Sequence, residues 1–175
     1  GSSPNGEETV AKLAAGFCDG DSDLAWTRLT SWRAQIAAVL DQPPYEPIQE
    51  VEVIGRPSQT STLLMAAWLQ LSLQVPVRVA QATDRELGRA QLRAIKLTRP
   101  SGVVTFERVS DSAVVLTQPG QPEQKIPMPV RDLPDVLAEE LRSLGPDRVF
   151  GEVLAAAAAA EARAHVAEET GEESQ

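Results

Sequence analysis

The chain of 175 residues has one cysteine, Cys18, and one histidine, His165, so two common sources of site chemistry are nearly absent. A single cysteine excludes an internal disulfide scaffold and a cysteine-based zinc site. We expect Cys18 to be an ordinary small apolar residue in a leader segment. His165 lies in an alanine-rich tail, where we expect an exposed helical position rather than an acid–base or metal-binding role, because a working histidine needs partners that orient it.

Long apolar runs and phosphate-binding glycine motifs are also missing. No run approaches the roughly 20 apolar residues that span a bilayer, and no signal peptide is evident. No G-x-G-x-x-G follows a predicted strand, so a Rossmann-type cofactor site is not expected. A cryptic enzyme would need a nucleophile, a base and an orienting group, and no such set is apparent. The sequence therefore predicts a soluble, intracellular, non-enzymatic domain with no membrane span, no cofactor and no metal.

The acidic charge is concentrated at the two ends of the chain. The net charge is −9, of which residues 1–22 contribute −3 (four acids, one base) and residues 151–175 contribute −5 (six acids, one base). The centre, with fifteen acids and fourteen bases, carries only −1. Acidic ends repel a phosphate backbone, so we expect no nucleic-acid partner.

The composition changes along the chain predict three parts. Residues 1–22 combine a remnant of a cleaved tag at Gly1-Ser2 with a short leader helix around Glu7 to Phe17. Residues 23–154 have the length and apolar content of a single globular domain. Residues 155–175 are expected to extend a helix through an alanine run and to end in an acidic, disordered segment.

The hydrophobic periodicity within the central part alternates between helix and strand. Period-2 alternation predicts strands, a longer apolar stretch predicts a buried helix, and short connections with Pro or Gly predict hairpins. The expected strands are 49–54, 77–80, 92–98, 103–108, 113–117 and 124–128, and the expected helices are 23–41, 60–74, 133–144 and 147–164. We therefore expect an α+β fold, in which a β-α-β unit precedes an antiparallel meander in one mixed sheet covered by helices.

Two of the three tryptophans lie six residues apart in the first expected helix. Trp26 and Trp32 are interleaved with Arg28 and Arg33, and Ser22 or Asp23 is the expected N-cap. One interpretation places both tryptophans in the core, as is usual for this residue. The other makes the tryptophans and arginines part of a docking surface, because both residue types are enriched in interface hot spots.

The sequence from Asp23 to Arg33, with its core W-x-R-L-T-x-W-R, resembles the glucose-6-phosphate dehydrogenase assembly protein family, OpcA. The likeness is to the second half of that family and continues through Tyr45. It extends more weakly through the segments 63–69, 116–120 and 137–147, so it covers most of residues 7 to 154.

The resemblance implies a cytoplasmic, non-enzymatic partner that helps glucose-6-phosphate dehydrogenase of the oxidative pentose phosphate pathway to assemble or to reach full activity. Family members are longer, which implies that this chain is a fragment without the N-terminal half. In photosynthetic relatives the role is linked to thiol redox control, and the lone Cys18 departs from that pattern. The expected partner contacts are Trp26, Arg28, Trp32 and Arg33, with Tyr45 on the adjoining proline-rich link.

A second cluster of arginines indicates an alternative function. Arg85, Arg89 and Arg93 recur at intervals of four, so a short helix there would present a row of guanidinium groups, unless Gly88 breaks it. Such a row is either a solvated face with local ion pairs or a site for an acidic patch, a sugar phosphate or a nucleotide. In the latter case the domain would be a small-molecule sensor that regulates a partner enzyme.

Overall fold

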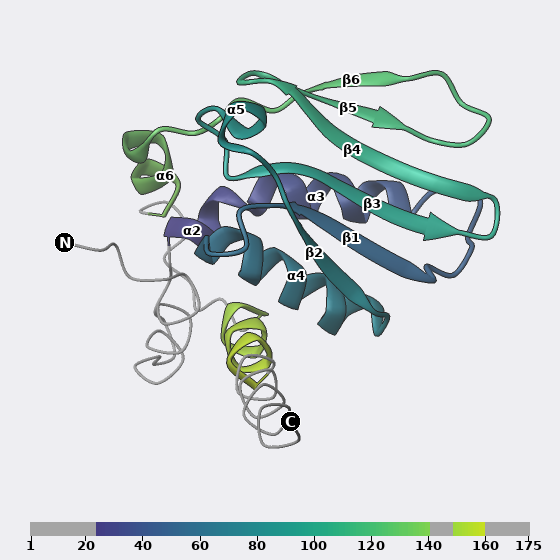
Figure 1. The fold of residues 1–175 in the computed structure, drawn as a ribbon, viewed down its shortest axis with the longest axis horizontal. Helices are drawn as coiled ribbons and strands as arrows, with labels where there is room; N and C mark the ends of the chain where they lie inside the picture. Colours follow the sequence, from purple (N-terminus) through teal and green to yellow (C-terminus); the bar gives the residue numbers. More distant parts are fainter. Residues whose placement is uncertain (1–23, 141–148, 160–175) are drawn as a thin grey trace, which may run out of the picture.

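The computed structural model describes residues 24–140 and 149–159, which form a six-stranded mixed sheet backed by helices (Figure 1). The strand order is β2-β1-β3-β4-β5-β6, with β1 parallel to β2 and every other pair antiparallel. The strands are β1 (Glu50–Gly55), β2 (Val77–Gln81), β3 (Leu92–Arg99), β4 (Gly102–Ser110), β5 (Ala113–Thr117) and β6 (Gln124–Pro127).

The β-α-β unit consists of β1, helix α4 (Thr60–Leu73) and β2. Val51 pairs with Val77, and α4 packs against both strands. Helix α4 has apolar side chains on most of its sides. One face is buried against the sheet, and Trp68 and other apolar side chains of the helix are partly buried. The helix ends at Leu73, because the next residue, Gln74, has a left-handed backbone (φ 56°) and Pro76 follows soon after.

The meander runs from β3 to β6 and has one buried face. On β3, Ile95 and Leu97 point into the core, whereas Lys96 and Thr98 lie on the partly exposed face. That outer face carries ion pairs, among them Glu52 with both Arg78 (2.7 Å) and Lys96 (2.9 Å). The predicted α+β fold, with its β-α-β unit followed by an antiparallel meander, is therefore confirmed.

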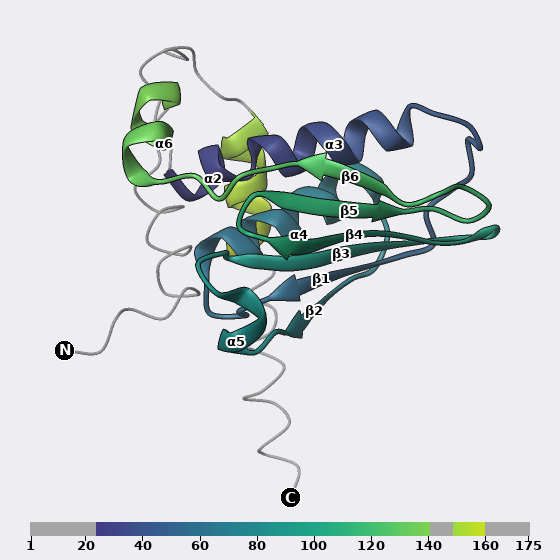
Figure 2. The same ribbon diagram turned by 90° about the horizontal axis from the view of Figure 1, so that it is seen from above.

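The helices gather on the buried side of the sheet, as Figure 2 shows for α2 (Leu24–Arg28), α3 (Thr30–Leu40) and α4. Residues 149–159 are helical and pack against α2 through Phe150. Two further helices, α5 (Asp84–Leu87) and α6 (Leu133–Glu140), lie near one end of the sheet. Within the described ranges, no helix is both long and apolar enough to cross a membrane.

The expected continuous helix over 23–41 is wrong in one respect, because it is interrupted at Leu29. The Leu29 N–H donates to the Trp26 carbonyl at 2.9 Å, which is an i to i−3 bond, and helical hydrogen bonding resumes from Arg33 to Leu29. Trp26, Leu29 and Trp32 are all buried, so three large side chains at and beside this turn lie in the core.

Several expectations fall outside the described residues. These are the leader helix, both proposed N-caps, Cys18, the end of the helix expected over 133–144, the chain beyond 159 and His165.

Candidate functional site

The tryptophans of the first two helices are core residues in this structure. Trp26 is 2% exposed and Trp32 is 4% exposed. The Trp26 ring lies 5.6 Å from the Phe150 ring, and the Arg33 guanidinium carbon lies 3.7 Å from the centroid of the Trp26 ring. At that distance the cation is attracted by the ring face. Trp26 therefore joins α2 to the helical segment 149–159 and supports the Arg33 side chain.

The residues expected to form a docking surface are not all on one face. Arg28 and Arg33 are partly exposed on α2 and α3, while Tyr45 is 77% exposed in the link that follows α3. Figure 2 places that link at the end of α3 opposite to α2. Glu46 holds the link in place, because its carboxylate accepts hydrogen bonds from the backbone N–H (3.1 Å) and hydroxyl (2.5 Å) of Ser101.

The expected row of arginines does not form. Helix α5 ends at Leu87, and Gly88 follows with a left-handed backbone (φ 53°). Arg93 instead belongs to β3, where it forms an ion pair with Glu107 (2.7 Å) and donates to the Arg108 carbonyl. Arg89 forms an ion pair with Asp132 at 2.5 Å. Arg85 is exposed.

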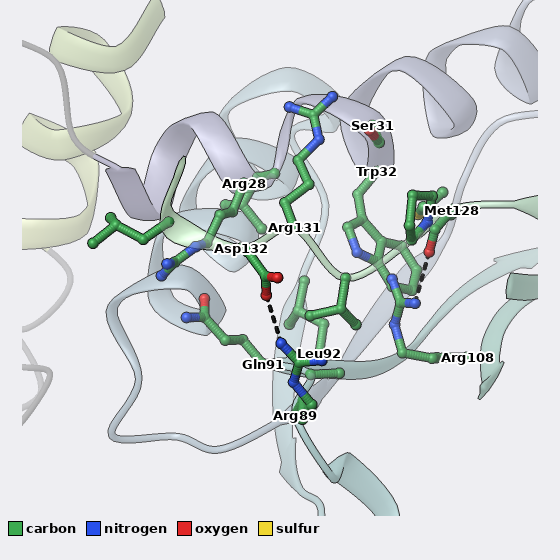
Figure 3. Close-up of a pocket in the computed structure, with 15 residues that line it drawn as sticks. Arg28, Ser31, Trp32, Arg89, Gln91, Leu92, Arg108, Met128, Arg131 and Asp132 are labelled. Carbon is green, nitrogen blue, oxygen red and sulfur yellow. Dashed lines mark hydrogen bonds and ion pairs between the residues drawn. The ribbon is translucent and has the colours of Figure 1, made fainter. Parts of the chain in front are cut away.

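The structure brings Arg28 and Arg89, from the two separate sequence clusters, to one pocket of about 250 Å³ (Figure 3). Its walls come from the α2–α3 junction, the segment before β3, the end of β4 and the segment that leads into α6. The lining residues are Arg28, Leu29, Ser31, Trp32, Arg89, Ala90, Gln91, Leu92, Arg108, Met128, Pro129, Val130, Arg131, Asp132 and Leu133. Among these lining residues the charged side chains are four arginines and one aspartate.

Arg108 is the most deeply buried of these cations, with 6% of its surface exposed. Its guanidinium donates to the Met128 carbonyl (2.8 Å) and the Ser110 carbonyl (3.2 Å), and it lies 5.5 Å from the Trp32 ring centroid. Burial lowers the pKa of Arg108 from its ordinary value, and the charge of Asp111 partly opposes that shift. Both hydrogen-bond acceptors of this cation among the described residues are therefore neutral carbonyls.

Sequence reasoning missed Arg108, Arg131 and Asp132 as neighbours of Arg28. One signal was available, because Arg108 continues the inward-facing series Val104 and Phe106 on a period-2 strand. A charged residue at an inward position indicates either a buried hydrogen-bonded cation or a ligand contact. Asp132 and Arg131 lie in a segment without a strong pattern, so only the fold could place them. No group of three metal-ligating side chains occurs in residues 24–140 and 149–159.

The fold and the pocket together define the class of protein. It is an α+β domain in which helices cover one face of a mixed sheet and a cationic pocket lies beside the α2–α3 junction. Comparison with protein-family models matches residues 19–154 to the family described as the C-terminal domain of a glucose-6-phosphate dehydrogenase subunit. The chain belongs to this family, OpcA, and the resemblance found in its sequence is confirmed. A search of curated proteins gives no match.

Proposed function

We propose that this domain is a non-catalytic, cytoplasmic subunit that binds glucose-6-phosphate dehydrogenase and promotes its active oligomer in the oxidative pentose phosphate pathway. The observation that supports the proposal is the family match, which extends over residues 19–154 and carries the name of a dehydrogenase subunit. A binding partner can activate an enzyme only if it binds the active state more tightly than the inactive state.

The proposed contact surface centres on Arg28 and Arg33, with Trp26 and Trp32 buried beneath it, and Tyr45 is a separate proposed contact beyond the far end of α3. Arg33 stacks on Trp26, which limits the conformations of its side chain before a partner binds. A side chain ordered in advance loses less entropy in the complex, and arginine and tyrosine are frequent interface hot spots. In this proposal Trp26 acts through Arg33, which it positions, and Trp32 contributes as a core residue of α3.

The test is the rate of NADP reduction by the dehydrogenase of the same organism, titrated with the domain. We expect activation by the unaltered domain, and at least a tenfold higher half-saturating concentration for Arg28→Ala combined with Arg33→Ala, because a hot-spot residue contributes about 2 kcal/mol or more. Arg78→Ala is the matched control: Arg78 is exposed on β2, and Lys96 still neutralises its partner Glu52.

Circular dichroism would verify that each variant is folded. Lack of activation by the unaltered domain would contradict the proposed role, whereas equal losses in the double variant and in Arg78→Ala would contradict the proposed surface.

The arginine-lined pocket favours a second function, namely a small-molecule sensor that regulates the partner enzyme. Guanidinium groups from separate elements around one cavity suit a ligand that carries phosphate or carboxylate.

A further inference from the structure

We propose that the pocket between α2, β4 and α6 binds a small phosphomonoester, with its phosphate held by Arg28, Arg89 and Arg108 and its carbon body against Trp32. This inference deepens the sensor function and names its ligand class. It does not depend on binding to the dehydrogenase, because the site lies entirely within this chain.

The first argument is the state of Arg108 at the inner wall of the pocket. A buried cation normally requires an ionic partner, since neutral hydrogen bonds replace only part of its hydration. Arg108 has two carbonyl acceptors and the face of Trp32, and its buried Nε has no hydrogen-bond partner among the described residues. Asp111 supplies part of the countercharge for Arg108, and an anion in the adjoining pocket would add to it.

The second argument is the availability of Arg28 and Arg89. Arg28 lines the pocket from the last turn of α2, and within the described part of the chain its buried Nε also lacks a hydrogen-bond partner. Arg89 pairs with Asp132, but their side chains are 66% and 60% exposed, so this ion pair is weak. The Arg89 guanidinium can therefore turn to a stronger acceptor. Figure 3 shows the three arginines entering from different elements around the cavity.

The third argument concerns the size and the apolar part of the pocket. Its volume of about 250 Å³ lies below the roughly 300–1,000 Å³ of sites for drug-sized ligands, which favours a small metabolite over a dinucleotide. Leu29, Trp32, Leu92 and Met128 supply an apolar wall, and Ser31 and Gln91 add polar groups beside it. A compact molecule with one phosphate and a small carbon body matches this lining.

The test is isothermal titration calorimetry of the full chain at low ionic strength with three probes: glucose 6-phosphate, inorganic phosphate and glucose. We expect glucose 6-phosphate to bind with one-to-one stoichiometry, inorganic phosphate to bind more weakly at the same site, and glucose not to bind. Arg28→Gln and Arg89→Gln should each weaken glucose 6-phosphate binding about ten- to a hundredfold, as expected for loss of a charged hydrogen bond.

Arg85→Gln is the matched control, because Arg85 is a nearby exposed arginine outside the pocket lining. Binding that survives Arg85→Gln and is lost in the pocket variants would support the site. Equal losses of glucose 6-phosphate affinity in all three variants would show diffuse charge attraction and overturn the proposed site. The site would also be overturned if glucose bound as tightly as glucose 6-phosphate, or if neither glucose 6-phosphate nor inorganic phosphate bound. Tight ligand binding without any effect on dehydrogenase activity would support the site and contradict the sensor function.

Discussion

Replacing Trp26 with alanine should lower the free energy of unfolding by about 3–5 kcal/mol, the usual cost of removing a large aromatic side chain from a core. The structure places this residue at the upper part of that range. Trp26 is 2% exposed, and its loss removes both the ring contact with Phe150 and the support beneath Arg33. Since domains are stable by only about 5–15 kcal/mol, the variant should lose a substantial share of its stability.

Urea unfolding followed by circular dichroism would measure the change, and the melting temperature should fall by about 6–20 °C for a chain of this size. Trp26→Phe should lose less, because a ring remains against Phe150. Tyr45→Ala, at a side chain that is 77% exposed, should change stability by no more than about 0.5 kcal/mol. A loss below about 1 kcal/mol for Trp26→Ala would refute the assignment of Trp26 to the core.

Two further predictions concern the outer face of the sheet and the turn between β3 and β4. The hydrogen bond from Lys96 holds the pKa of Glu52 below its ordinary value of 4.5, burial opposes this, and the charges of Lys96 and Arg78 add to it. The resulting stability is therefore present above about pH 4.5 and is lost as the pH falls through the folded-state pKa. Between about pH 6 and pH 2 the free energy of unfolding of Glu52→Gln should fall less steeply than that of the unaltered chain, and an equal slope would contradict this. Gly102→Ala should lower the free energy of unfolding in urea titrations more than Gly120→Ala does. Both glycines have positive φ (129° and 71°), but only at Gly102 would an added Cβ meet Pro119, at 2.9 Å. Equal losses of stability would show that this contact relaxes freely.

Strands such as β1 and β4 were predictable because one face is buried, and a period-2 pattern then fixes which residues point inward. Val51 and Val53 on β1 alternate with Glu52, and the structure confirms the strand with its ends shifted by one residue. The parallel pairing of β1 and β2 followed from the helix between them, since parallel strands need a crossover connection.

The interruption at Leu29 could not be predicted, because Leu29, Trp32 and Ile36 fit one uninterrupted helical stripe. The pattern also gives no sign that Trp26 meets Phe150, a residue far later in the chain. The pocket was hidden for a similar reason: Arg28, Arg89 and Arg108 become neighbours only when the sheet and helices assemble. The expected arginine row failed at Gly88, where a left-handed residue ends α5.

The proposed function as a dehydrogenase partner is tested most directly by the mass of a mixture of this domain and the dehydrogenase of the same organism, measured by size-exclusion chromatography with light scattering. The proposal predicts a co-eluting complex whose mass equals a dehydrogenase oligomer plus bound copies of the domain, with the oligomer larger or more abundant than for the enzyme alone. Separate elution of the two proteins at micromolar concentration, with the oligomeric state of the dehydrogenase unchanged, would contradict it.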